Sequence, residues 1–290
     1  MKNIIFQYMV TNEDTASRGK VPQYKAGNGD RVELYRKTAD LSAESFRIYA
    51  EKIGATHHYS KKQVYTAGKS GNTVLLFECL RCIYDEMYDE FDQLLFVDTD
   101  IIANTEENIF ELAGDYDVCG VYESDIRSDT DGGYNSWDYD DKKRILIEEK
   151  YARHGIPIVP TSPPQRPSSI ATLNTGVLIW SRDARLRARE VFDPWYDYVL
   201  DGIEHDTPFW LNNDQPWISG QLVKHGFSVL GLDQTWNDTP THYRDWHGDY
   251  GEGAMSAYDK WKNQNFLHYT GGGNKVEMLR HHQMDLFKYI

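Results

Sequence analysis

Short apolar runs alternate along the chain with longer segments whose apolar residues have the spacing of a helix. The apolar runs predict strands at residues 3–10, 55–59, 94–97, 116–122 and 171–180. The longer segments predict helices at residues 41–53, 73–88, 109–112, 141–153, 184–200 and 215–225. Strands that alternate with helices favour an α/β fold, with a mostly parallel central sheet and helices on both faces.

Two segments interrupt this alternation. Residues 123–141 are polar and rich in Gly, Asp and Tyr, which predicts a loop over the edge of the sheet. Residues 154–169 hold five of the ten prolines, so they form neither a central strand nor a helix. This second segment is either a mobile flap over a site or only a loop on the surface.

Composition excludes several classes of partner. The chain has 290 residues, with 31 Lys and Arg against 45 Asp and Glu, which gives a formal net charge of -14. This charge repels nucleic acids and anionic membrane surfaces. No apolar stretch approaches the roughly 18 residues that span a bilayer, and residues 1–10 are too polar for a signal peptide. We therefore expect a cytoplasmic protein with no nucleic-acid partner and no transmembrane segment.

Two short motifs do not predict a function. Cys79 and Cys82 form a C-x-x-C motif inside an apolar helical pattern, with no second pair. Together with Cys119 they are expected to be reduced thiols in the core. The sequence N-D-T at residues 237–239 is a glycosylation sequon, which we interpret as a chance match because the chain shows no secretion signal.

The most informative motif is D-T-D, in which Asp98 and Asp100 directly follow the apolar run L-L-F-V. The run predicts a strand buried on both faces, and because strand side chains alternate, both carboxylates should emerge on one side. Open α/β sheets bind their ligands at the carboxyl ends of the strands. Two hard oxygen ligands there suit a divalent cation that takes further ligands from water and substrate phosphates. A strand that runs into an acidic turn is the alternative interpretation.

Three further motifs follow along the chain: N-T-G at residues 174–176, N-N-D-Q-P-W at 212–217 and F-L-H-Y-T-G-G-G-N-K at 266–275. In this order, the four motifs resemble those of the metal-dependent GT-A glycosyltransferases, and most of all family 8, which includes glycogenin and the bacterial lipopolysaccharide galactosyltransferases. The resemblance covers nearly the whole chain. It implies one GT-A domain over residues 1–290, with a nucleotide-binding half at 1–122 and a donor-sugar and acceptor half at 123–290.

The resemblance also implies a metal site. Asp98, Asp100 and His268 correspond to the family's ligands of Mn²⁺, or Mg²⁺, and this oxygen and nitrogen ligand set is plausible for Mn²⁺. The metal would hold the nucleotide diphosphate and neutralise the charge that develops on it as it leaves. Gly271 matches a glycine that lets phosphate approach closely. Lys275 resembles a lysine that contacts the diphosphate, although it lies one residue later than in the family.

Further positions are implied to bind the donor. Arg81 corresponds to a basic residue that contacts the donor sugar and phosphate, and Asp125 to a carboxylate that binds sugar hydroxyls. Arg81 could instead be a helix-surface charge, and Asp125 one of several loop acids. Asn174 and Gly176 match the family's turn beside the donor sugar.

The resemblance places Asp214 and Gln215 at the reactive face of the anomeric carbon. An alternative role for Asp214 is to cap the helix that follows. Family membership implies retention of the anomeric configuration, yet the sequence shows no unambiguous carboxylate nucleophile. We therefore favour a front-face displacement, in which the leaving phosphate accepts the proton of the acceptor and the protein supplies position and electrostatics. A double displacement through Asp214 is the other retaining route.

Two regions are expected to contact the base and the acceptor. Tyr8 and Thr11, at the end of the first strand, should approach the nucleotide base, although the long polar loop from residue 11 to 40 departs from the family. Residues 233–261 mix aromatic and polar side chains, which suits stacking on sugar rings. The acceptor surface is accordingly assigned to Trp236, Trp246 and Tyr250, with an aromatic core under a long loop as the alternative.

The sequence therefore predicts a Mn²⁺-dependent glycosyltransferase. It is expected to move a hexose from a nucleotide sugar, with a UDP-sugar as the favoured donor, to a hydroxyl of a glycan or glycosylated acceptor. Two alternatives stay open. One is an inverting GT-A transferase with Asp214 or Asp125 as its base, and the other is a non-catalytic protein that binds a nucleotide sugar.

Overall fold

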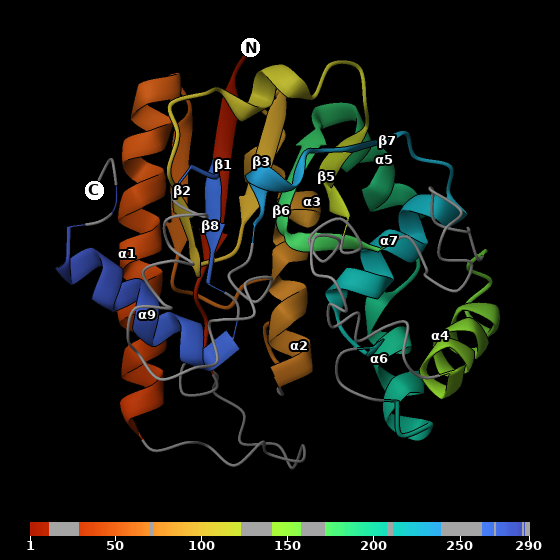
Figure 1. Cartoon of the computed structure of the whole chain (residues 1–290). Helices are drawn as coiled ribbons and strands as arrows, with labels where there is room; N and C mark the ends of the chain where they lie inside the picture. The colour runs from red at the N-terminus through yellow and green to blue at the C-terminus, as the bar shows by residue number, and fades with distance from the viewer. Residues whose placement is uncertain are drawn as a thin grey trace.

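The computed structural model describes residues 1–11, 29–69, 72–122, 141–157, 172–207, 211–238, 263–269, 271–285 and 287. Its centre is a six-stranded sheet in the order β2-β1-β3-β6-β5-β7, flanked by helices (Figure 1). The strands are β1 (Asn3–Tyr8), β2 (Thr56–Ser60), β3 (Gln93–Val97), β5 (Val118–Tyr122), β6 (Leu173–Ser181) and β7 (Val229–Gly231). Within this sheet only β6 runs antiparallel to its neighbours. The predicted α/β fold with a mostly parallel sheet is confirmed.

Alternating side chains of each central strand enter two separate hydrophobic cores. In β3, Leu94 and Phe96 pack in one core, whereas Leu95 and Val97 pack in the other. All four are buried, which explains why this strand reads as an unbroken apolar run. The sheet is therefore covered on both faces, and its functional groups lie at the strand ends.

Different helices form the two cores. On one face lie α2 (Asn72–Leu76), η1 (Phe77–Leu80), α3 (Arg81–Tyr84), α5 (Arg182–Val191), α6 (Trp195–Glu204) and α7 (Asp214–Lys224). The other face is covered by α1 (Gly29–Ile53), η3 (Ile109–Leu112) and η6 (Gln234–Trp236). The helix α4 (Asp141–Arg153) packs through Leu146 and Tyr151 against Leu211, near the start of α7.

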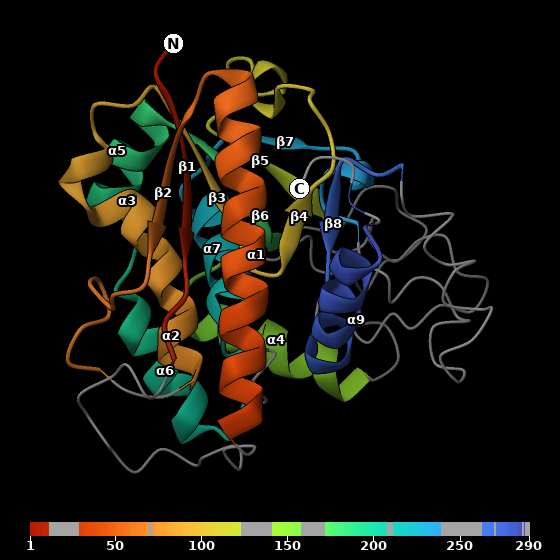
Figure 2. The same ribbon diagram turned by 90° about the vertical axis from the view of Figure 1, so that its left-hand side faces the viewer.

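A second, two-stranded sheet lies beside the first. Its strands β4 (Ile101–Ala103) and β8 (Phe266–His268) pair antiparallel, with Ile101 opposite His268. The helix α9 (Gly271–Gln283) follows β8 and packs against α1 (Figure 2). Because β4 begins directly after the D-T-D turn, this pairing brings a histidine far along the chain next to the acidic motif.

Several expected elements differ from the structure. The polar segment expected as a loop up to residue 40 is helical from Gly29 onward, as the first part of α1. The helix expected at 73–88 is divided into α2, η1, α3 and η2 (Glu86–Tyr88). The helix expected at 184–200 is divided into α5 and α6, because Pro194 disfavours helical geometry in the residue before it. The strands β4, β7 and β8 were not predicted.

Two expectations from composition can be compared with the described part of the chain. The three cysteines are buried free thiols, as predicted. Among the described residues, no helix combines the length and apolar character that crossing a membrane requires.

Candidate functional site

The D-T-D turn lies between β3 and β4 and is held by buried polar groups. The backbone N–H of Asp98 donates to the carbonyl of Gly176 at 2.9 Å. On the next strand, the Gln7 amide donates to the Asp98 carbonyl at 3.3 Å and to the Ser42 hydroxyl at 2.9 Å. Ser42 in turn donates to the carbonyl of Ile101 at 2.6 Å. Both ends of the turn are therefore fixed to the sheet and to α1.

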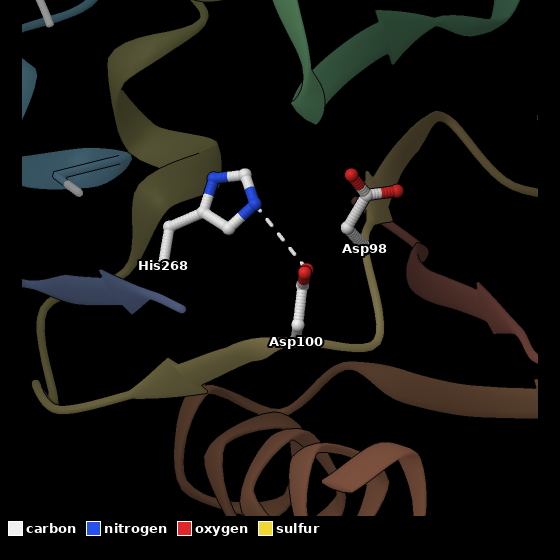
Figure 3. A group of neighbouring side chains, drawn as sticks. All are labelled: Asp98, Asp100 and His268. Atoms are coloured by element: carbon white, nitrogen blue, oxygen red, sulfur yellow. Dashed lines mark ion pairs between the residues drawn. The ribbon is translucent and has the colours of Figure 1, made fainter. Parts of the chain in front are cut away.

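Asp98, Asp100 and His268 form a cluster that could hold a metal ion. One potential ligand atom of each residue lies within 4.8 Å of the others (Figure 3). The His268 Nε2 atom is 3.2 Å from Asp100 Oδ1, and the Lys275 Nζ atom is 2.5 Å from Asp100 Oδ2. This set of two carboxylates and one imidazole was predicted from the motifs, and the structure brings its three members together.

The two carboxylates of the cluster differ in charge compensation. Burial and the neighbouring Asp100 raise the pKa of the Asp98 carboxyl. Burial alone would also raise the pKa of Asp100, but the Lys275 ammonium and the adjacent His268 ring outweigh it and hold this pKa well below its usual range. Asp100 is thus stabilised as an anion, whereas ionised Asp98 lacks an equal partner. A bound cation would supply the missing positive charge.

Gly176 leaves room beside the cluster. A Cβ atom at this position would lie 2.8 Å from His268 Cε1 and 3.2 Å from Asp98 Oδ2. It would also lie 2.8 Å from the side-chain oxygen of Asn174. The absence of a side chain on β6 is therefore what allows these groups to approach one another.

Asp214 lies at the first position of α7 and faces the same region. Its carboxylate accepts hydrogen bonds from the side chains of Thr175 and Cys79, with the Cys79 Sγ atom at 3.7 Å. Burial raises its pKa to about 6. Its charge also acts on Asp98, which places both acids in one electrostatic environment.

The helix α7 is capped by Asn213, whose side chain accepts from the backbone N–H of Gln215 at 3.1 Å. The alternative in which Asp214 is the capping residue is therefore wrong. Its carboxylate accepts from the side chain of Thr175 and also from the backbone N–H groups of Asp214 and Gln215 in the first turn.

The chain was compared with family models, curated proteins and solved structures. No family model and no curated protein matches the chain. The solved structures that match it include glycosyltransferases, with TM-scores under 0.5. One of them, involved in the glycosylation of the major capsid of PBCV-1, is 14% identical with a TM-score of 0.48, over 97% of this chain and 100% of that one.

Two further structures show the same likeness. An active-site mutant of LgtC is 12% identical with a TM-score of 0.42, over 96% of this chain and 95% of that one. Mouse xyloside xylosyltransferase 1 is 12% identical with a TM-score of 0.44, over 93% of this chain and 98% of that one. At these identities and TM-scores the likeness carries no assignment of function to this chain.

The other predicted donor residues have partners within the protein. The Tyr8 hydroxyl donates to the carbonyls of residues 75 and 76, each at 3.0 Å. The Arg81 guanidinium is buried and donates to Asp85 and to Ser60, each at 2.8 Å, so it is not a helix-surface charge. The roles of Tyr8, Arg81 and Thr11 toward a nucleotide stay predictions.

The expected acceptor surface needs one correction. Trp236 is 4% exposed and packs edge-on against Phe266 within a hydrophobic core, so it offers no face to a sugar. For this residue the alternative of an aromatic core was right. Trp246, Tyr250 and Asp125 lie outside the described residues.

Sequence reasoning missed Asn237, which is fully buried beside the cluster. Its side-chain oxygen is 2.7 Å from His268 Nδ1, and its side-chain nitrogen donates to Asn174 at 2.9 Å. The sequence offered a signal at this position, the N-D-T sequon, but that pattern indicates glycosylation rather than support of a histidine.

Proposed function

We propose that the protein is a metal-dependent glycosyltransferase that uses a nucleotide-diphosphate sugar. The observation that most supports this is the cluster of Asp98, Asp100 and His268 at the carboxyl end of β3. Ligands of α/β sheets bind at this edge, and carboxylate oxygens with an imidazole nitrogen suit Mn²⁺ or Mg²⁺. The space that Gly176 leaves and the raised pKa of the Asp98 carboxyl fit the same assignment.

Different residues around the cluster are proposed to bind the metal and the diphosphate. Asp98, Asp100 and His268 would hold the metal, which supplies positive charge to the diphosphate as it leaves. Lys275, at 2.5 Å from Asp100, lies on the first turns of α9 and would bind the diphosphate. The N-terminus of α9 at Gly271 adds backbone N–H groups and the positive end of the helix dipole.

Asp214 and Gln215 are the proposed residues at the anomeric carbon. The Asp214 carboxyl is buried, and its raised pKa of about 6 leaves it ionised at neutral pH. It therefore stabilises positive charge that develops on the sugar ring. A glutamine amide is a poor nucleophile, so we favour a front-face displacement with retention, in which Asn174 and Gly176 position the donor sugar.

The finer assignment follows from the resemblance of the motifs. We propose Mn²⁺ as the metal, a hexose as the transferred group, UDP as the nucleotide and a hydroxyl of a glycan as the acceptor. An inverting transferase with Asp214 as its base is the second candidate, since this carboxylate is buried and acts electrostatically on Asp98. The anomeric configuration of the product distinguishes the two.

Release of nucleoside diphosphate from UDP-sugars, measured with and without Mn²⁺, tests the proposal. Asp100→Asn should abolish metal-dependent release, because it removes one ligand charge while keeping the size of the side chain. Asp115→Asn, at an exposed position, is the matched control and should retain full activity. Unchanged release by Asp100→Asn, or equal release without metal, would contradict the metal assignment. Binding of the nucleotide sugar without any turnover would favour the non-catalytic alternative.

A further inference from the structure

A chain of hydrogen bonds connects the backbone of β6 to the imidazole of His268. It begins at the backbone N–H of Gly176, which donates to the side-chain oxygen of Asn174 at 2.9 Å. The same oxygen accepts from the side-chain nitrogen of Asn237 at 2.9 Å. The chain ends where the Asn237 side-chain oxygen meets His268 Nδ1 at 2.7 Å.

The direction of every bond in this chain is determined by its first member. A backbone N–H can only donate, so the atom of Asn174 that faces Gly176 is its oxygen. The atom of Asn237 that faces this oxygen must then be its nitrogen, and the atom that faces His268 must be its oxygen. That oxygen can only accept, so His268 carries a hydrogen on Nδ1. The opposite tautomer would place two lone pairs against each other at 2.7 Å.

Main-chain contacts keep Asn237 in this place. The residue follows η6 and is fully buried. The next residue, Asp238, forms a parallel bridge to Leu267, and its carbonyl accepts from the backbone N–H of His268 at 2.8 Å. The amide of Asn237 and the imidazole of His268 are therefore held side by side by the backbone. A fully buried side chain is also not available for glycosylation.

The consequence for His268 concerns its other ring nitrogen. Figure 3 shows that Nε2 faces Asp100, and the two atoms are 3.2 Å apart. With hydrogen held on Nδ1, Nε2 is the ring nitrogen whose lone pair becomes available when a cation lies between the ring and the carboxylates. This is the form of imidazole that binds a metal, and ligand histidines commonly gain this orientation from a hydrogen bond at the second nitrogen.

We propose that Asn237 and Asn174 are positioning residues that set the tautomer of His268 and so prepare Nε2 as a metal ligand. The part that concerns the metal rests on the proposed function, whereas the part that concerns the tautomer does not. Asn174, which the motif places beside the donor sugar, thereby has a second role, since its oxygen orients Asn237.

Nitrogen-15 NMR of the histidine rings in the metal-free protein tests the tautomer directly, at a pH where the His268 ring is neutral. The wild type should carry the hydrogen of His268 on Nδ1. In Asn237→Ala, the Nδ1 hydrogen loses its acceptor, and a substantial fraction should move to Nε2, where Asp100 accepts it. Asn265→Ala removes a nearby, partly buried amide outside the chain of bonds, and it should leave the tautomer unchanged.

Conservative variants separate positioning from a structural role. Asn237→Asp retains an oxygen acceptor for Nδ1, so it should keep the wild-type tautomer even if its stability falls. Asn174→Asp retains the oxygen that orients Asn237 and should behave likewise, whereas Asn174→Ala should not. Hydrogen on Nε2 alone in the wild type, or an unchanged tautomer in Asn237→Ala, would overturn the proposal.

Titration with Mn²⁺ separates failure of this inference from failure of the proposed function. We expect Asn237→Ala to weaken Mn²⁺ binding by about 10-fold to 100-fold, the usual effect of losing a group that supports a metal ligand. If the tautomer responds as predicted but the wild type binds no Mn²⁺, the metal assignment is wrong and the tautomer assignment stands. If Mn²⁺ binds with equal affinity to Asn237→Ala and wild type, Asn237 does not prepare the ligand.

Discussion

At the scale of single residues, the site depends on two carboxyl groups that the fold holds close together although their charges repel each other. Asp98 and Asp100 are carboxyl groups two positions apart, and Asp100 lies against the Lys275 ammonium and the His268 ring. The space beside them exists because β6 carries glycine at position 176. Single substitutions at these positions should therefore affect the affinity for a cation more than the folding stability of the protein.

Gly176→Ala tests the space beside the cluster. The added methyl group would lie 2.8 Å from His268 Cε1 and 3.2 Å from Asp98 Oδ2, so the ligands must move apart. We expect Mn²⁺ affinity, measured by calorimetry, to fall at least about 10-fold. Gly220→Ala is the matched control. Gly220 lies in α7, and its added methyl group would lie 2.8 Å from the side chain of Ile156 instead of from the cluster. Equal loss of affinity in both variants would show that the effect is not local.

Lys275→Gln tests the competition between lysine and metal for Asp100. In the absence of a ligand, the Lys275 ammonium neutralises Asp100 and repels a cation. We expect the variant to bind Mn²⁺ alone several-fold more tightly and UDP with Mn²⁺ several-fold more weakly, as measured by separate titrations. Lys52→Gln, which removes a surface pair with Glu106, is the control. Weaker binding of Mn²⁺ alone would contradict this role of Lys275.

At the scale of secondary structure, elements that carry a strong local signal were predictable and those that depend on distant partners were not. The apolar run of β3 is buried on both faces, and the sequence shows it without ambiguity. The strands β4 and β8 have three residues each, and each is stabilised by pairing with the other across the length of the chain. Such pairs leave no periodic pattern, because three residues are too few to reveal one.

A buried lysine connects α4 to the segment before α7. The Lys150 amine is fully buried, donates to the side-chain oxygen of Asn212 at 2.6 Å and lies 3.6 Å from the centre of the Tyr198 ring. Burial lowers its pKa from 10.5 to about 7. Between these two pH values, the unfolded chain binds a proton that the folded protein does not, so folding stability should rise with pH.

Lys150→Met tests this linkage. The wild type should gain stability on the order of 3 kcal/mol from this residue between pH 7 and pH 10, and the variant should lack that gain. The measurement is urea unfolding at several pH values. Lys37→Met, at an exposed position of α1, is the control and should follow the wild type. A variant with the same pH dependence as the wild type would show that Lys150 is not buried as described.

At the scale of the whole molecule, the candidate site is assembled from distant parts of one chain. The D-T-D turn follows β3, Gly176 lies on β6, Asp214 begins α7 and His268 ends β8. The order of motifs was enough to predict the metal cluster, because a known family carries the same order. Asn237 was not predictable in this way, since its role comes from main-chain contacts between η6 and β8 that no local pattern records.

The most direct test of the central claim is the thermal unfolding midpoint with UDP or GDP, each with and without Mn²⁺. A ligand at about 100 times its dissociation constant adds roughly 2.7 kcal/mol, which should raise Tm by about 5 °C or more in a protein of this size. We predict this shift with UDP only when Mn²⁺ is present, and its loss in Asp100→Asn. If Tm rises with GDP and Mn²⁺ but not with UDP and Mn²⁺, the protein is still assigned as a glycosyltransferase, and its donor is a GDP-sugar. No shift with any pair, or an equal shift without metal, would contradict the account.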